Sequence, residues 1–269
     1  MRRSTPSGPA GLTPRGPAPL ESGGPVIFPL KGDVPSRSWP VVTLGLIALN
    51  VLVFLYQVSL GIDIRGPGAA AAEALIVEFG VTPCRLTHSC PTGVSRMLGD
   101  FPHPWATIFT SMFLHANVLH VGGNMLFLWI FGNNVEDTIG HGRFVLFYLA
   151  SGVVAAVGQT LVTPSSPVPL IGASGAVSGV LGAYLVLFPH ATILTLVMLG
   201  FFIKIFRIPA LVVLGFWIGL QLLNGYLTYS AQALGRAESG GVAWFAHIGG
   251  FLGGIVLLFL LRRRQSSRL

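Results

Sequence analysis

Two polar side chains in apolar surroundings, Ser174 and His247, have the types needed for nucleophilic catalysis. A serine hydroxyl becomes an effective nucleophile when a neighbouring base, commonly a histidine, accepts its proton. Ser174 lies in the glycine-rich run GASGAVSG, and His247 precedes the glycines of AHIGGFLGG. The pair predicts an activated serine if the fold brings these two distant segments together.

A second polar group lies in HANVLHVGGN, where His120 and Asn124 are four residues apart. Residues at this spacing share one face of a helix, so both side chains can donate hydrogen bonds to one point. Donors of this kind, together with backbone N–H groups at a helix start, stabilise a developing oxyanion. His115 would lie about 140° from His120 around the same helix, which indicates a different role.

Each of these features also has a structural interpretation. Glycine runs and isolated polar side chains in membrane helices commonly serve close packing and interhelical hydrogen bonds. We interpret Gln221 and Asn224 in this way. The coincidence of a serine, a histidine and a His/Asn donor pair, with glycines beside both the serine and His247, favours chemistry over packing alone.

Composition places these residues in a membrane. The chain has 269 residues, of which 52% are hydrophobic and 9% charged, and its mean hydropathy is +0.73. Ordinary soluble domains carry about 25% charged residues. The net charge of +7 could indicate nucleic-acid binding, but the basic residues form no stripe with interleaved aromatic residues. We therefore expect the lipid bilayer, and no nucleic acid, as a partner.

Six segments are apolar enough for α-helical spans, each of which needs roughly 20 residues. They are residues 41–60, 115–134, 144–163, 171–188, 210–229 and 243–261. Residues 61–104 carry seven charges and are expected to form a long loop. Residues 192–206 are apolar but short and contain Lys204, so we expect a membrane-surface or partly buried connection there.

The distribution of basic residues supports six crossings with both termini in the cytoplasm. This arrangement leaves four of the sixteen Lys and Arg residues outside (Arg65, Arg85, Arg96 and Arg236) and the other twelve inside. The fourth and sixth spans then both start at the outer side, so Ser174 and His247 share a depth. From Ser174 to Pro189 a helix extends about 22 Å, less than the ~30 Å hydrocarbon core. Ser174 is therefore expected below the outer membrane surface.

Glycines spaced four apart follow both Ser174 and His247. Gly175 and Gly179 form one small-residue face, and Gly250 and Gly254 form another. Such faces allow two helices to approach closely. They predict contact between the fourth and sixth spans.

Taken together, HANVLHVGGN, GASGAVSG and AHIGGFLGG resemble the motifs of the rhomboid intramembrane serine proteases, and so does FGNNVEDTIG with Glu136. The resemblance covers about residues 40–262. It implies an all-α membrane protein, a rhomboid-like bundle of six transmembrane helices of the bacterial type. The implied activity is that of a serine endopeptidase without cofactor or metal, which cleaves transmembrane protein substrates within or next to their spans.

The resemblance also implies roles by position. Ser174 matches the nucleophile, and His247 matches the general base of a dyad that has no carboxylate. His120 and Asn124 match the oxyanion-hole side chains, alongside the Ser174 backbone N–H. His115 matches a histidine that supports the site and the adjoining loop.

Two positions depart from the pattern of some relatives. Ser178 stands where those relatives have a tyrosine that packs against the base, so His247 must be held by other contacts. Ala106 follows Trp105 where others have a Trp-Arg pair, so no arginine anchor is expected in the first loop.

The remaining expectations concern the loop cysteines, the tails and the rival functions. Cys84 and Cys90 could form a disulfide, stay as free thiols, or bind a metal with His88 between them. Residues 1–39 are expected to be a disordered Pro/Gly/Ser-rich cytoplasmic tail, 40–262 the membrane domain, and 263–269 a basic cytoplasmic tail. We expect a bacterial plasma membrane. The alternatives are a catalytically silent rhomboid-like client-binding protein and a small transporter, whose expected internal repeats are not evident.

Overall fold

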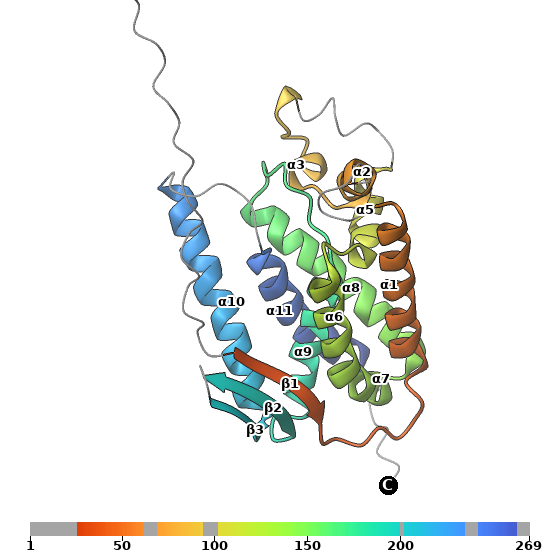
Figure 1. Cartoon of the computed structure of the whole chain (residues 1–269), viewed down its shortest axis with the longest axis vertical. Coiled ribbons are helices and arrows are strands. Elements are labelled where there is room, and N and C mark those ends of the chain that lie inside the picture. Colours follow the sequence, from red (N-terminus) through yellow and green to blue (C-terminus); the bar gives the residue numbers. More distant parts are fainter. Residues whose placement is uncertain (1–25, 62–68, 94–101, 200–201, 235–241, 263–269) are drawn as a thin grey trace, which may run out of the picture.

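The computed structural model describes residues 26–61, 69–93, 102–199, 202–234 and 242–262. Long helices run side by side and form a bundle, with short helices at one end and a small sheet at the other (Figure 1). The long helices are α1 (Val41–Ser59), α8 (His141–Val162), α10 (Ala210–Ala233) and α11 (Trp244–Leu261). We call the two ends of the bundle the loop end and the sheet end.

Each of the six predicted spans corresponds to a helix, so the predicted helical membrane bundle is confirmed. Within the described ranges, four helices are individually long and apolar enough to cross a membrane: α1, α8, α10 and α11. A fifth crossing results if the bent pair of residues 104–113 and 118–139, which meet at 84°, counts as one span. The remaining segment is the 14-residue helix α9 (Ser174–Leu187), which is too short for a span by itself.

The second predicted span begins and ends later than predicted. Helix α6 (Val118–Phe127) starts at Val118 because the Asn117 side chain accepts a hydrogen bond from the His120 N–H at 2.9 Å and caps the helix. The helix then continues through a π-helical turn, η2 (Leu128–Gly132), into α7 (Asn133–Ile139). It stops at Gly140, whose φ of 87° suits a glycine.

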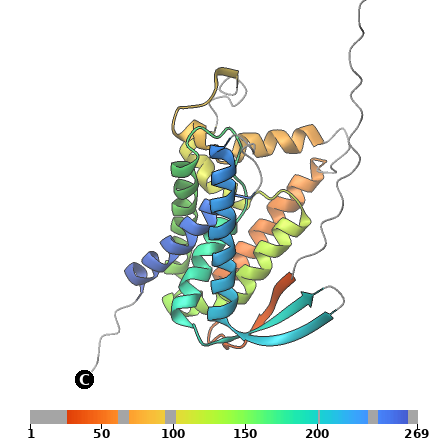
Figure 2. The same cartoon turned by 90° about the vertical axis from the view of Figure 1, so that its left-hand side faces the viewer.

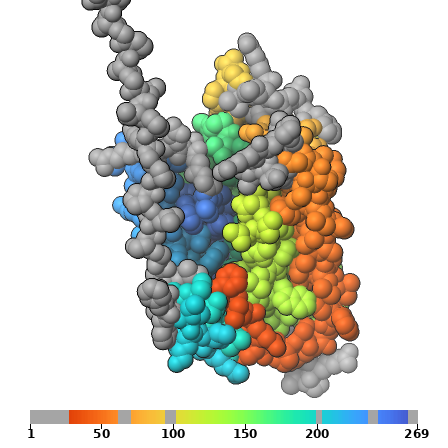
Figure 3. All heavy atoms as spheres, in the orientation of Figure 1, coloured from red at the N-terminus to blue at the C-terminus, as the bar shows by residue number. Residues whose placement is uncertain are grey.

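Helix α9 forms the centre of the bundle. Every side chain from Ala176 to Tyr184 is buried, and the helix lies among α6, α8 and α11 in Figure 1. A helix enclosed by other helices can be apolar all round, which explains why its sequence shows no polar face. The space-filling view shows the surface of α6 between that of α1 and those of α10 and α11 (Figure 3).

The sheet end carries a three-stranded antiparallel sheet in the order β1-β2-β3. Its strands are β1 (Val26–Gly32), β2 (Thr192–Leu199) and β3 (Phe202–Pro209). Residues 192–199 and 202–206 therefore lie in two paired strands and not in a helical crossing, and these strands extend sideways from the end of α10 (Figure 2). Ile193 and Thr195 of the central strand are fully buried, so the connection is partly buried as expected.

The expectation of a disordered tail over residues 1–39 is wrong for residues 26–39. Residues 26–32 form β1, because an apolar run pairs with β2 from Val26 opposite Met198 to Gly32 opposite Ile193. Residues 37 and 38 are held by Asp137, which accepts hydrogen bonds from the backbone N–H groups of Arg37 at 2.6 Å and Ser38 at 3.0 Å. Residues 1–25 and 263–269 lie outside the described residues.

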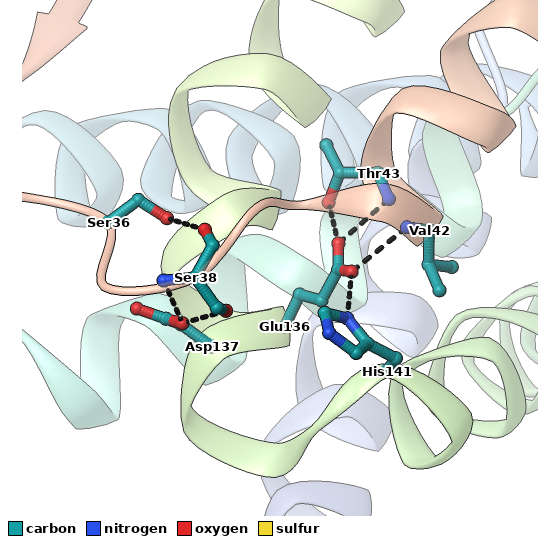
Figure 4. Close-up of polar contacts among 7 residues, drawn as sticks. All are labelled: Ser36, Ser38, Val42, Thr43, Glu136, Asp137 and His141. Atoms are coloured by element: carbon teal, nitrogen blue, oxygen red, sulfur yellow. Dashed lines mark hydrogen bonds and ion pairs between the residues drawn. The ribbon is translucent and has the colours of Figure 1, made fainter.

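A buried carboxylate fixes the start of α1 to the rest of the bundle (Figure 4). Glu136 is fully buried and accepts hydrogen bonds from the Val42 N–H at 2.9 Å and the Thr43 N–H at 2.8 Å. The Thr43 hydroxyl donates at 2.6 Å, and His141 Nδ1 lies 2.6 Å from the same carboxylate. A helix N-terminus stabilises negative charge, so Glu136 is an effective cap despite its burial.

The loop end contains α2 (Ala69–Phe79), α3 (Pro83–Leu86), α5 (Pro104–Thr110) and the short helix η1 (Ser111–Phe113). Here Cys84 and Cys90 are joined by a disulfide. Of the three alternatives for these cysteines, the structure has the disulfide. It ties α3 to the segment that follows.

Candidate active site

The hydroxyl of Ser174 and the imidazole of His247 meet between α9 and α11. The distance from His247 Nε2 to Ser174 Oγ is 2.9 Å. Ser174 is the first residue of α9, and His247 lies in the first turn of α11. Both side chains come from helix starts at the same level of the bundle, as the six-span topology predicts.

The glycine faces bring α9 and α11 together. A Cβ built on Gly250 would lie 3.1 Å from the carbonyl carbon of Gly175, and one on Gly254 would lie 2.6 Å from that of Gly179. Backbone atoms cannot move aside as a flexible side chain can. The predicted contact between these small-residue faces is confirmed, and it sets the separation at which Ser174 meets His247.

The second nitrogen of His247 has a partner that the sequence analysis did not assign. His247 Nδ1 lies 2.8 Å from Gln221 Oε1 on α10, and Gln221 is only 6% exposed. The ring of Trp217, one turn away on α10, packs 5.9 Å from the imidazole. In the sequence, Gln221 is an uncharged polar residue in an apolar span, four positions after Trp217. We interpret it there as structural.

Ser178 does not take the place of the missing tyrosine. Its hydroxyl donates to the Ser174 carbonyl oxygen at 2.6 Å, within its own helix. Gln221 and Trp217 on α10 instead contact the imidazole of His247.

His120 and Asn124 point toward the backbone that precedes Ser174. A Cβ added to Gly172 would lie 2.6 Å from His120 Nε2 and 3.6 Å from Asn124 Nδ2. This close approach and the φ of +117° both favour glycine at this position. His120 Nδ1 accepts from the Ala116 N–H at 3.3 Å, which leaves the proton on the Nε2 that faces Gly172. Asn124 Nδ2 is buried and has no hydrogen-bond partner among the described residues. Two side-chain donors thus converge beside the start of α9.

His115 occupies the turn before α6, so the predicted helical angle between His115 and His120 does not apply. Its buried ring accepts a hydrogen bond at Nε2 from the Ala173 N–H at 3.4 Å. Its backbone N–H donates to Gln57 Oε1 at 3.0 Å, and its carbonyl accepts from Gln57 Nε2 at 3.2 Å. His115 thereby links α1 to the residue that precedes Ser174.

These side chains open onto one cavity of about 460 Å³. Ser174, His247, His120 and Asn124 line it together with apolar residues that include Phe127 and Trp217. Within the part of the chain that the structure describes, no group of three His, Cys, Asp or Glu residues is placed to hold a metal ion. The cavity thus combines an apolar wall with a serine, a histidine and two amide or imidazole donors.

The arrangement agrees with comparisons to known proteins. A model of the rhomboid domain matches residues 102–264. The chain is 34% identical over 155 residues to rhomboid protease GluP of Bacillus subtilis, which covers 58% of this chain and 26% of that protein. It is 28% identical over 172 residues to the putative rhomboid protease YdcA of the same organism, and this match covers 64% of this chain and 74% of YdcA.

A longer match extends to RHOMBOID-like protein 6, mitochondrial, of Arabidopsis thaliana. It is 32% identical over 250 residues, which covers 88% of this chain and 73% of that protein. Other relatives are much longer than the matched region, since the chain spans 26% to 56% of GluP, the chloroplastic rhomboid-like protein 11 and the yeast mitochondrial rhomboid protein 1. With the domain model matching more than half of its length, this chain belongs to the rhomboid family.

Proposed function

We propose that the protein is an intramembrane serine endopeptidase that works with a Ser174–His247 dyad. The observation that carries the proposal is the 2.9 Å contact between Ser174 Oγ and His247 Nε2 at the wall of the cavity. This is the distance at which a base can take the proton of a nucleophile. Relatives whose names include rhomboid protease support the same reaction class.

In the proposed reaction, Ser174 Oγ attacks the scissile carbonyl carbon while its proton moves to His247 Nε2. The C–N bond then breaks as His247 returns that proton to the leaving amine, and an acyl-enzyme remains. A water molecule then attacks the acyl carbon while its proton moves to His247 Nε2. The bond from the acyl carbon to Ser174 Oγ breaks as His247 returns that proton to Oγ, which releases the carboxyl product and restores the Ser174 hydroxyl. The steps follow the acyl-transfer template of serine proteases.

The oxyanion of each tetrahedral intermediate would be stabilised by three donors. They are His120 Nε2, Asn124 Nδ2 and the Ser174 backbone N–H, which as the first N–H of α9 has no intrahelical acceptor. Two features support this assignment: Asn124 Nδ2 is buried without a partner in the described structure, and the proton of His120 faces Gly172. His115 would support the site through the Ala173 N–H.

The substrates would be transmembrane proteins cut within or next to their spans, in a cell membrane. Their helices would unwind locally at small or helix-breaking residues to expose a carbonyl. The distribution of basic residues supports an orientation with the sheet end and both termini in the cytoplasm and the loop end outside. A bacterial plasma membrane suits this compact chain, and the loop-end disulfide fits an oxidising outer side.

Labelling with a fluorophosphonate probe tests the function. The purified wild-type chain in detergent is expected to label covalently, whereas Ser174→Ala does not and His247→Ala labels at least about 10³-fold more slowly. Ser178→Ala is the matched control, because the Ser178 hydroxyl lines the same cavity but donates its hydrogen bond within α9, to the Ser174 carbonyl, and this variant is expected to label like the wild type. A wild-type chain that neither labels nor cleaves a transmembrane reporter would support the catalytically silent alternative.

A further inference from the structure

We propose that Gln221 is a positioning residue for His247, so that the site works as a Ser174–His247–Gln221 unit built from three helices. The inference rests on the proposed function, because positioning matters only if His247 acts as a base. It answers how the imidazole is held when neither a carboxylate nor the tyrosine of some relatives is present.

The contact to Gln221 determines which nitrogen of His247 carries the proton. Gln221 Oε1 is an acceptor without a hydrogen, so at 2.8 Å it requires a proton on His247 Nδ1. Nε2 is then free of hydrogen in the neutral ring and can accept from the Ser174 hydroxyl at 2.9 Å. This is the tautomer that a general base needs.

The orientation of the Gln221 amide is itself set by a neighbour. Its Nε2 donates to the Trp217 carbonyl oxygen, one helical turn earlier, at 3.4 Å. A flipped amide would place Oε1 against that carbonyl, so two acceptors would face each other. It would also offer a donor to His247 Nδ1 and move the imidazole proton to Nε2, where it would oppose proton transfer from Ser174.

Packing restricts the ring as well. Trp217 stacks beside the imidazole with centroids 5.9 Å apart, and Trp244 meets it edge-on at 6.5 Å. Among the hydrogen bonds that the described residues make, the imidazole of His247 has the two partners Ser174 and Gln221. Two rings and two hydrogen bonds thus define both the plane and the tautomer.

The surroundings favour an amide over a carboxylate at this position. Gln221 is buried in α10, and an ionised carboxylate within a membrane span is costly. A neutral acceptor also stabilises the imidazolium less strongly than an anion does. We therefore expect the loss of Gln221 to reduce turnover about 10- to 100-fold, in line with one hydrogen bond to a ring that becomes charged during the reaction. The loss should be smaller than the ~10⁴-fold effect of disabling an aspartate orienter.

Three variants of the full chain in detergent test the inference. Gln221→Met keeps the length but removes the acceptor, and it should lower kcat on a transmembrane reporter while KM changes little. Gln221→Glu restores an acceptor and should recover activity to within about 10-fold of wild type. Asn224→Leu, a polar-to-apolar change on the same helix one turn on, is the matched control and should leave kcat unchanged.

A spectroscopic measurement separates positioning from a structural role. In ¹⁵N-histidine-labelled protein, with the His247 signals assigned by their absence from His247→Ala, Nδ1 should be protonated and Nε2 bare. In Gln221→Met the two tautomers should mix while thermal stability stays near that of Asn224→Leu. An Nε2-protonated ring in the wild type, or full kcat in Gln221→Met, overturns the inference.

The two proposals fail in different ways. A wild-type chain that does not label with fluorophosphonate refutes the protease function. In that case the protonation of His247 Nδ1 still tests whether Gln221 accepts a hydrogen bond from the imidazole. If Gln221→Met does not fold, the wild-type tautomer and the rescue by Gln221→Glu decide the question. Labelling of Gln221→Met at the wild-type rate refutes only the positioning role.

Discussion

The seam between α9 and α11 sets the distance between Ser174 and His247, and one added methyl group should change it. A Cβ on Gly254 would lie 2.6 Å from the carbonyl carbon of Gly179. Carbon atoms in contact prefer about 3.5–4.0 Å, so Gly254→Ala requires the helices to separate by about 1 Å. Backbone cannot be displaced as cheaply as a side chain, and the separation should extend to the start of both helices.

The same displacement would stretch the contact between Ser174 Oγ and His247 Nε2 from 2.9 Å to nearly 4 Å. That distance is no longer a hydrogen bond, and a misplacement of about 1 Å can reduce a rate ~10²-fold. Overpacking costs about 1–3 kcal/mol, partly offset by the ~1 kcal/mol preference of alanine over glycine in a helix. We therefore expect a rate lower by about two orders of magnitude with a free energy of unfolding lower by at most about 2 kcal/mol.

The matched control is Gly219→Ala on α10, where an added Cβ meets nothing within 4 Å. It gains the same helix propensity and should be as active as wild type and slightly more stable. Both variants are compared by fluorophosphonate labelling rate and by thermal unfolding in detergent. If Gly254→Ala labels as fast as Gly219→Ala, the seam does not set the geometry of the dyad and the reasoning is wrong.

Three further outcomes follow from the structure. Glu136→Gln should lower the free energy of unfolding by about 1–3 kcal/mol, because one oxygen that accepts from α1 is replaced by an NH2 donor. Thermal unfolding measures this, with Glu73→Gln at an exposed position as the control. Equal melting points of the two variants would refute the capping role of Glu136. Asn124→Ala should reduce kcat by ~10²–10³-fold while KM is nearly kept, because the lost donor acts on the transition state; a change confined to KM would contradict an oxyanion role. Cys90→Ser should lower stability by less than about 3 kcal/mol, because the disulfide closes a short loop, and wild type with reductant should behave alike in the same melting experiment.

The helical part of the fold was predictable because it depends on local patterns. Hydropathy located the helices of the six predicted spans, and small-residue spacing predicted the seam between Gly175, Gly179, Gly250 and Gly254. The short length of α9 also followed from the position of Pro189. The start of α6 at Val118 lies three residues after the predicted start, because the capping side chain of Asn117 sets that boundary and hydropathy does not register it.

The sheet could not be predicted because its pairing is non-local. Residues 26–32 and 192–199 are far apart in sequence, and neither run alone distinguishes a strand from a short apolar connection. The prolines and glycines around β1 suggested disorder, yet Pro29 is accommodated beside an irregularity in the pairing between Pro29 and Lys31. Such a strand is defined by its partner, which a single sequence does not show.

The three-helix arrangement around His247 shows why membrane burial favours neutral partners in such a site. A carboxylate orienter would have to be desolvated in the apolar interior, whereas the Gln221 amide satisfies both of its ends, Oε1 on His247 and Nε2 on Trp217. The buried carboxylate of Glu136 is instead placed where the N-terminus of α1 stabilises its charge and His141 contacts it. The charge of Glu136 thus lies at a helix end, and the proposed dyad depends on glycine packing and neutral hydrogen bonds for its alignment. The reactivity of a dyad aligned in this way should be sensitive to helix separation and insensitive to surface charge. The fluorophosphonate labelling rate should therefore fall in Gly254→Ala and stay at the wild-type value in Glu73→Gln.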